Sequence, residues 1–367
     1  MTRHRHHILH VVPGLGAGGM ELAMAGVVKG LTGSAMEHAI VCLKGRAEIR
    51  DRLPIETVIH CLNSKPNEPQ LPFRLARLVR QLRPDVIHAR NWGAWPDIAI
   101  ARLLVRPLTP FIFSFHGLGE AGYMPWRRRL ASAILVHLTS NLFTVSKQSK
   151  EMLVKYWGWP KHQTEIIPNG VDTKIFQPHP RPNNKRPVIG SVGNLRSVKN
   201  HALILKACSQ LVTEGVDLEI RIAGEGDQRE PLTSLAQTLG LTDRLYLPGR
   251  VEDIPGFLNG LDVFVLSSDS EQHPNALNEA LACGVPSVAT RVGCAADLLD
   301  GGRCGRIIRP GQVHELTDAL RELAQDRPLR HALGEAGMNY VRAHFSLDVM
   351  VRKYHDLYLR AARRKYC

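Results

Sequence analysis

Short apolar runs alternate with longer stretches of helical periodicity along most of this chain. The runs are rich in β-branched and aromatic residues, and the stretches between them repeat apolar residues at helical spacing. Strands separated by helices form parallel sheets with right-handed crossovers, so the pattern predicts an α/β fold. The predicted strands are Ile8–Val12, Ala39–Leu43, Val86–His88, Phe111–Phe115, Leu142–Val145, Glu165–Ile167, Val188–Val192, Leu218–Ala223, Leu245–Leu247, Val263–Leu266 and Ser287–Ala289.

The alternation is interrupted once, in residues 172–187, which contain four prolines and a polar run. We interpret this segment as a linker, because a chain of 367 residues is too long for one compact core. The sequence therefore predicts two Rossmann-like, doubly wound domains, residues 1–171 and 188–346, that face each other across a cleft. Ligands of such sheets bind at the carboxyl ends of the strands. The basic segment 347–367 has helical periodicity.

The segment Glu271–Glu279 carries two carboxylates eight residues apart, with Pro-Asn between them. Asn275 is a suitable N-cap, so Ala276–Cys283 is predicted to be helical, with Gly284 at its end. The first amides of a helix are unpaired and attract anions, so Asn275 and Ala276 are predicted to bind phosphate. The alternative is an ordinary solvated helix start with two incidental acids.

The same segment resembles the Glu-x7-Glu motif of the retaining glycosyltransferases of family 4, which have the GT-B fold. The resemblance implies that Glu271 lies near the donor sugar and that Glu279 holds the ribose of a nucleotide. It also implies that segment 347–367 crosses back to the first domain as a helix, although a solvated tail helix would show the same pattern. Motifs between residues 12 and 291 follow the order of this family.

Two further segments of the second half follow strands and contain glycine and basic residues. Gly193-Asn-Leu-Arg196 precedes Lys199, and cations at this spacing suit a diphosphate leaving group. The family usually has arginine where this chain has Asn194, so Arg196 is the candidate replacement beside Lys199. Arg250 and Val251 resemble the segment that brackets the nucleotide base in this family. The identity of the base, and so whether the nucleotide is UDP or GDP, is left open.

The glycine-rich segment after the first predicted strand permits two interpretations. Gly14, Gly16 and Gly19 match the Gly-x-Gly-x-x-Gly pattern of dinucleotide sites, and the basic Lys44-Gly-Arg46 suits the 2′-phosphate of NADP. An NADP-dependent oxidoreductase is therefore one alternative. The longer string through Gly18, Gly19 and Glu21 resembles the Gly-Gly-x-Glu opening of family 4, which borders the donor phosphate and the acceptor.

Two strand ends of the first half carry polar residues. His116 follows a predicted strand and precedes a glycine, where an imidazole can contact a sugar hydroxyl or polarise a reacting group. The family resemblance assigns it to the donor sugar, whereas the plainer interpretation is a structural loop histidine. The segment His88–Trp92 ends the preceding strand, and it is predicted to line the same cleft on the acceptor side, with Asn91 among the contacts.

Composition adds an anionic partner to this picture. The formal net charge is +13, and no nucleic-acid-binding signature accompanies it, so phosphorylated substrates or acidic lipid are favoured. The segment Tyr123–Val136 joins aromatic residues and three arginines to an apolar helix, which suits an anionic membrane surface. A core helix with a solvated start is the alternative. Seven cysteines without a Cys-x-x-Cys pair favour a reducing, cytoplasmic location over a metal or disulfide framework.

The sequence as a whole predicts a retaining glycosyltransferase that uses a UDP- or GDP-linked sugar. No Asp-x-Asp pair occurs, so neither a metal nor another cofactor is expected. The expected acceptor is a hydroxyl of a saccharide or a polyprenyl-linked saccharide in polysaccharide or cell-envelope biosynthesis, at the inner face of the plasma membrane. A non-catalytic basic binding protein of the same fold is the second alternative.

Overall fold

A computed structural model describes residues 5–16, 18–45, 48–117, 125–180 and 184–363 of the chain. It divides into two compact units. The first contains the chain up to Asn169 and again from Leu347, and the second is Gly170–Ser346. The predicted linker, 172–187, falls within the second unit, where Phe176 packs on the core. Arg46, Tyr123 and residues 181–183, named in the predictions above, lie outside the described residues.

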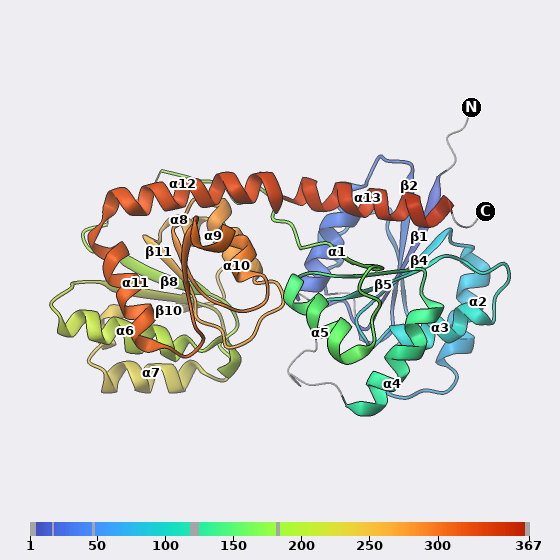
Figure 1. The fold of residues 1–367 in the computed structure, drawn as a ribbon, viewed down its shortest axis with the longest axis horizontal. Helices are drawn as coiled ribbons and strands as arrows, with labels where there is room; N and C mark the ends of the chain where they lie inside the picture. The colour runs from blue at the N-terminus through green and yellow to red at the C-terminus, as the bar shows by residue number, and fades with distance from the viewer. Residues whose placement is uncertain (1–4, 17, 46–47, 118–124, 181–183, 364–367) are drawn as a thin grey trace. The chain divides into compact units, whose positions relative to one another are not determined.

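The first unit is built on a seven-stranded parallel sheet with the order β3-β2-β1-β4-β5-β6-β7 (Figure 1). Its strands are β1 (His6–Val12), β2 (Met36–Cys42), β3 (Val58–Cys61), β4 (Val86–Arg90), β5 (Phe111–Phe115), β6 (Asn141–Thr144) and β7 (Thr164–Ile166). Its α-helices are α1 (Gly19–Gly30), α2 (Leu71–Leu82), α3 (Trp95–Leu103), α4 (Trp126–Leu135), α5 (Lys147–Trp157) and α13 (Leu347–Arg363).

The second unit repeats this plan with a six-stranded parallel sheet in the order β10-β9-β8-β11-β12-β13. Its strands are β8 (Val188–Val192), β9 (Glu219–Ala223), β10 (Leu245–Gly249), β11 (Val263–Leu266), β12 (Ser287–Thr290) and β13 (Gly305–Ile308). Its α-helices are α6 (His201–Thr213), α7 (Arg229–Thr238), α8 (Ile254–Asn259), α9 (Asn275–Ala282), α10 (Ala295–Leu298), α11 (Val313–Gln325) and α12 (Arg327–His344). Both sheets confirm the predicted pair of Rossmann-like, α/β domains.

Every predicted strand is present, but two strands were not predicted. Strand β3 pairs with β2 at the edge of the first sheet, and β13 pairs with β12 at the edge of the second. Residues at both ends of β3 are exposed, so its side chains do not form a clear apolar run. Strand β13 begins with glycine and includes Arg306, which weakens its apolar signal.

The order of strands reverses direction once in each sheet. In the first sheet the reversal lies between β1 and β4, and in the second it lies between β8 and β11. Crossover loops leave in opposite directions at such a point, so a crevice opens at the carboxyl ends of the two strands. The loops after these four strands are therefore the ones expected to bind ligand.

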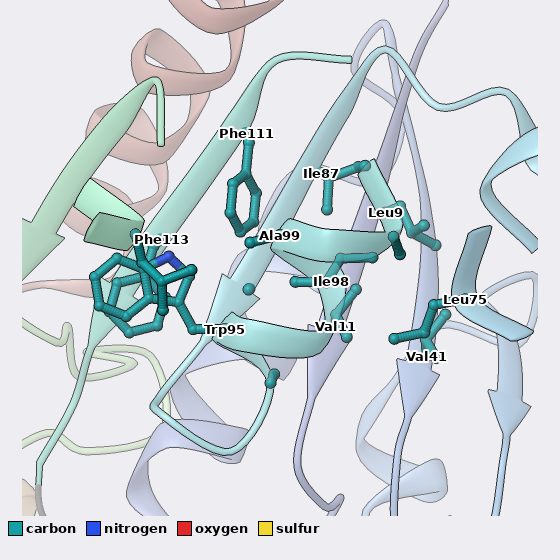
Figure 2. Packing of buried hydrophobic residues seen from close by; sticks show 14 of the residues in the cluster. Leu9, Val11, Val41, Leu75, Ile87, Trp95, Ile98, Ala99, Phe111 and Phe113 are labelled. Atoms are coloured by element: carbon teal, nitrogen blue, oxygen red, sulfur yellow. The ribbon is translucent and has the colours of Figure 1, made fainter. Parts of the chain in front are cut away.

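The core beneath the first sheet packs aromatic rings beside aliphatic side chains, with Trp95, Phe111 and Phe113 among Leu, Val and Ile residues (Figure 2). The Trp95 ring is stacked on Phe113 with a centroid separation of 3.8 Å and meets Trp159 edge-on at 5.8 Å. The indole of Trp95 is fully buried and donates a hydrogen bond to the Thr139 hydroxyl at 3.0 Å. The polar atom of this large side chain is thus satisfied within the apolar cluster.

Helix α13 is an integral part of the first unit. Met350, Tyr354, Leu357 and Tyr358 are buried in the same apolar cluster as Ile8 of β1. Glycines on α1 permit the close approach of α13: a Cβ added at Gly30 would lie 2.5 Å from Cγ2 of Val351, and one at Gly26 would lie 3.0 Å from Leu347. The helix predicted for 347–367 is confirmed over Leu347–Arg363.

We predict that Gly30→Leu separates α13 from α1. Val351 is short and β-branched, so it cannot move aside without disturbing the helix contact. Overpacking of this kind costs about 1–3 kcal/mol in the free energy of unfolding, measured by urea denaturation. Lys29→Leu, at the neighbouring exposed position, is the matched control and is expected to change stability little. Equal stability of the two variants would show that the α1–α13 contact is loose.

Candidate active site

The loops after β8 and β11 bring two predicted residues together. The ammonium group of Lys199 forms an ion pair with the Glu271 carboxylate, and the Ser268 hydroxyl donates to the same carboxylate at 3.1 Å. Ser267 donates to the Lys199 carbonyl at 2.8 Å, which holds the two loops against each other. Both charged side chains are only partly exposed. Lys199 and Glu271 thus lie at the strand-order reversal of the second sheet.

Glycines allow each of these two loops to be approached closely by the loop of the neighbouring strand, β9 beside β8 and β12 beside β11. A Cβ at Gly224, whose φ is +148°, would lie 1.9 Å from the Gly193 carbonyl oxygen. A Cβ at Gly293, whose φ is +53°, would lie 2.6 Å from the Glu271 carbonyl oxygen. The Lys199 side chain passes 3.8 Å from the Cβ position of Gly193. The glycines therefore give the loops their shape, and the side chains of Lys199 and Glu271 provide the chemistry.

Helix α9 follows the Glu271 loop, and its start differs from the prediction. Pro274 is the N-cap and Asn275 is the first helical residue, so Asn275 is not the N-cap. Proline has no polar side chain to cap the first amides, while the Asn275 side chain lies 3.1 Å from Nδ1 of His273. Asn275 and Ala276 still occupy the first turn, which is the position of a phosphate at a helix N-terminus. The predicted ending at Gly284, with φ +69°, is confirmed.

Glu279 lies on α9 beneath this loop, and its surroundings differ from those of Glu271. Neighbouring protein atoms desolvate the carboxyl group, and this burial raises its pKa to about 7. Glu271, by contrast, has a cationic partner in Lys199. The two carboxylates of the motif therefore differ electrostatically.

The other predicted residues of the second unit lie on neighbouring loops. Arg196 is exposed and is the N-cap of the short 3-10 helix that ends at Lys199. Arg250 is exposed and Val251 is half-buried, directly after β10. The Gly224 amide donates to the Gly249 carbonyl at 2.8 Å, so the β9 and β10 loops are joined through their backbones.

In the first unit, the glycine-rich segment leads directly into α1. Gly18 is the N-cap and Gly19 is the first residue of the helix, whereas the sequence pattern predicts a start at Met20 or Glu21. A Cβ at Gly18 would lie 2.5 Å from a carboxylate oxygen of Glu21, so glycine leaves room for this side chain. Burial raises the pKa of Glu21, although the charge of Arg90 opposes the increase. The Gly-Gly-x-Glu string thus places a partly desolvated acid in the first turn of α1.

His116 and Asn91 lie together beyond the ends of β5 and β4. The Asn91 side chain accepts a hydrogen bond from the His116 amide at 2.7 Å, and Nε2 of His116 lies 3.0 Å from the Ser114 hydroxyl. Asn91 adopts φ +59° and its amide donates to the Ser114 carbonyl at 2.9 Å. Both residues are half-buried, and these hydrogen bonds hold His116 at the end of β5.

The prediction that the whole segment His88–Trp92 lines a cleft is wrong for His88 and Arg90. Both are fully buried, because their side chains alternate into the face of the sheet that α13 covers. Nδ1 of His88 lies 2.9 Å from the Tyr358 hydroxyl and Nε2 lies 2.9 Å from Ser114. A hydrogen-bonded chain therefore runs from Tyr358 through His88 and Ser114 to His116.

Sequence reasoning also missed the group of histidines around Arg90. The Arg90 guanidinium contacts Nδ1 of His10 at 2.7 Å, and Nε2 of His10 contacts His38 at 2.9 Å. Burial, and secondly the charge of Arg90, holds the pKa of His10 and His88 well below the usual range and lowers that of His38 to about 4. The three histidines are thus neutral, and His10 accepts from the buried Arg90. Their positions on three different strands gave no local signal.

Two family models match the chain, one in each half. The model described as Glycosyltransferase Family 4 matches residues 17–175, and that of Glycosyl transferases group 1 matches residues 172–340. Together they span both Rossmann-like units. The chain belongs to the glycosyltransferases of family 4. It is therefore a transferase, and neither the oxidoreductase nor the non-catalytic alternative is retained.

Individual relatives of this glycosyltransferase have several different names. A D-inositol 3-phosphate glycosyltransferase of Corynebacterium jeikeium is 25% identical, over 94% of this chain and 93% of its own length. An N-acetyl-alpha-D-glucosaminyl L-malate synthase of Bacillus anthracis is 29% identical over 46% of this chain and 44% of that protein. The relatives share glycosyl transfer, and their named products differ.

Solved structures show the same fold. A glycosyltransferase from Rickettsia africae has a TM-score of 0.86 at 20% identity and covers 97% of this chain and 98% of its own. HepE from Anabaena, in complex with UDP and glucose, has a TM-score of 0.80 at 18% identity and covers 96% and 99%. In the part of this transferase that the structure describes, no helix is long and apolar enough to cross a membrane.

We predict that Glu279 makes the stability of the transferase depend on pH. The folded protein keeps this carboxyl protonated up to about pH 7, whereas the unfolded chain ionises near its ordinary value of 4.5. The free energy of unfolding should therefore fall as pH rises from about 4.5 to 7, by up to about 3 kcal/mol. Urea denaturation across this range should show the loss in the wild type and not in Glu279→Gln. Glu252→Gln, at an exposed position, is the control and should retain it.

We also predict that Tyr358→Phe destabilises the first unit. Removing the hydroxyl leaves one nitrogen of the buried His88 without its partner, at a cost of about 1–3 kcal/mol in the free energy of unfolding. Urea denaturation measures the change. Tyr156→Phe, whose ring is 49% exposed, is the matched control and is expected to stay within about 0.5 kcal/mol of wild type. Equal stability of Tyr358→Phe and wild type would show that the hydrogen bonds running from Tyr358 to His116 do not stabilise the fold.

Proposed function

We propose that this glycosyltransferase moves a sugar from a UDP- or GDP-linked donor to a hydroxyl of a saccharide or polyprenyl-linked saccharide, with retention of anomeric configuration. The observation that carries the proposal is the Lys199–Glu271 ion pair at the strand-order reversal of the second sheet. A cation and a carboxylate in contact match the two charges that the reaction creates. The diphosphate leaves as an anion, and the anomeric carbon becomes partly cationic.

Donor binding exchanges the partner of Lys199 in this proposal. The diphosphate carries more charge than one carboxylate, so it competes with Glu271 for the ammonium group. Lys199 then balances the leaving group together with Arg196 and the N-terminus of α9, at Asn275 and Ala276. Glu271 is released toward the sugar, where its carboxylate stabilises the cationic transition state. No metal or other cofactor is needed for this balance of charge.

Glu279 is proposed to hold the ribose, and Arg250 and the backbone of Val251 to bracket the base. A carboxyl group with a pKa of about 7 can accept from one ribose hydroxyl in its ionised form. Hydroxyl donors favour the ionised carboxylate, so nucleotide binding should lower this pKa and release a proton. UDP is supported as the nucleotide by its presence in the HepE complexes, whose fold this chain shares.

The first unit is proposed to receive the acceptor and to contact the sugar through His116. Gly18, Gly19 and Asn91 lie beyond the strands at the reversal of the first sheet, where an acceptor hydroxyl is expected. Two relatives from Rhizobium meliloti are named lipopolysaccharide core biosynthesis glycosyltransferases. These names favour a cell-envelope saccharide as acceptor, and a cytoplasmic enzyme at the inner face of the plasma membrane.

We predict opposite effects of the two members of the ion pair on nucleotide affinity. Lys199→Met should weaken UDP or GDP binding by about 10- to 100-fold, because one charge-assisted hydrogen bond to phosphate is lost. Glu271→Gln should bind the nucleotide at least as tightly as wild type, because the competing carboxylate is gone, yet lose at least about 100-fold in sugar transfer. Calorimetric titration with each nucleotide and turnover of the sugar donor measure the two quantities.

Controls separate this prediction from general damage. Lys206→Met, on the exposed side of α6, should leave nucleotide affinity unchanged. EDTA should leave both binding and turnover of wild type unchanged, and a strict requirement for Mg²⁺ or Mn²⁺ would contradict the proposed charge balance. If Glu271→Gln weakens nucleotide binding as much as Lys199→Met does, Glu271 contacts the nucleotide and not the sugar.

A further inference from the structure

Helix α4 has an apolar stripe on its exposed side. Trp126, Leu130 and Ile134, spaced four residues apart, are 68%, 60% and 59% exposed. Residues at this spacing lie on one face of a helix. Single exposed apolar side chains are common, but a surface helix ordinarily turns its apolar stripe toward the core. In α4 the side chains that turn inward are Ser132 and Leu135.

The arginines of α4 separate into two kinds. At about 100° per residue, Arg127 and Arg129 fall on opposite sides of the Trp126–Leu130–Ile134 stripe, whereas Arg128 falls on the inward side. The guanidinium carbon of Arg128 lies 5.8 Å from the centroid of the Trp92 ring, next to the aromatic core. Arg127 and Arg129 contact Trp126 and Tyr156, and all three arginines are exposed. Within the described residues, these three arginines form no ion pair with a carboxylate.

The neighbouring helix α5 extends the same surface. Tyr156 is 49% exposed and lies beneath both Arg129, at 6.0 Å, and Lys155, at 5.1 Å. The surface thus combines an apolar stripe, two aromatic rings and three flanking cations. Aromatic rings and basic side chains beside an apolar stripe are the composition that suits the interface of an anionic bilayer.

We propose that this surface, formed by Trp126, Arg127, Arg129, Leu130, Ile134, Lys155 and Tyr156, is where the enzyme lies on an anionic lipid bilayer. The apolar stripe enters the boundary between headgroups and acyl chains, and the flanking cations contact anionic headgroups. A lipid surface is favoured over a second copy of this chain, because two such cationic surfaces would repel each other and the chain has a formal charge of +13. The proposal deepens the proposed function, since it places the enzyme where a polyprenyl-linked acceptor is found.

The test is sedimentation of the full chain with vesicles of phosphatidylcholine alone and with added phosphatidylglycerol. Wild type should bind the anionic vesicles, and more weakly as salt rises. Leu130→Ser with Ile134→Ser should weaken binding at least tenfold. Arg127→Ser with Arg129→Ser should weaken it about 30-fold, at about tenfold for every 1.4 kcal/mol and about 1 kcal/mol for each basic residue.

Matched controls change similar residues elsewhere on the first unit. Phe73→Ser removes a ring that is 64% exposed on α2, and Arg352→Ser with Lys353→Ser removes two exposed cations of α13. Both controls should bind anionic vesicles as wild type does. Binding that falls equally in the controls would show attraction by net charge alone and would overturn the proposal, as would unchanged binding of the two α4 variants.

Two further readouts distinguish membrane binding from self-association and from the proposed sugar transfer. Sedimentation velocity without vesicles should show the same mass for wild type and Leu130→Ser/Ile134→Ser; a wild-type dimer that this variant dissociates would assign the surface to self-association and overturn the proposal. Vesicle binding is measured without donor or acceptor, so it does not depend on the proposed reaction. A failure of Lys199→Met to weaken nucleotide binding would contradict the proposed function and leave the vesicle result unaffected.

Discussion

Close contact between backbone loops is the constraint on which the candidate site depends. Parallel strands end at one edge of a sheet, and the reversal of strand order leaves neighbouring loops to fill the space above it. Gly224 allows the β9 loop to touch the β8 loop, and Gly293 allows the β12 loop to touch the β11 loop, since a Cβ at either position would overlap a carbonyl oxygen. A change to either glycine would therefore act on the ion pair without touching it.

The first unit meets a different constraint, which is a fully buried arginine whose carboxylate neighbour, Glu21, is only partly buried. A cation in a protein interior is costly unless its donors are satisfied. Arg90 has neutral imidazoles and tyrosine rings around it: it contacts Nδ1 of His10 at 2.7 Å, and its guanidinium carbon lies 6.0 Å from the centroid of the Tyr354 ring. Tyr354 and Tyr358 come from α13, so closure of this environment requires the end of the chain. The helix thereby contributes to the region that positions His116.

Much of the fold was predictable from sequence, because strands buried on both faces form continuous apolar runs. The edge strand Val58–Cys61 was missed for the opposite reason, since edge residues face solvent. Asn275 was misassigned as an N-cap because propensity favours asparagine there, whereas the proline before it takes that position in the structure. His88 and Arg90 were placed in a cleft because polar residues at a strand end suggest a ligand. Their partners on distant elements have no local signature.

At the predicted site, too, the sequence does not show which side chains contact each other. Family resemblance identified Lys199 and Glu271 separately, one as a phosphate ligand and the other as a sugar ligand, and only the folded loops show that the two side chains contact each other. That contact joins the two side chains, so an anion that binds Lys199 competes with Glu271 for the ammonium group. The surface arginines show the same limit: all three are exposed and look equivalent in the sequence, yet helix geometry directs Arg128 to the Trp92 ring and leaves Arg127 and Arg129 beside the exposed stripe. Which residues carry charge is thus a property of the sequence, and which of them share a function is decided by the fold.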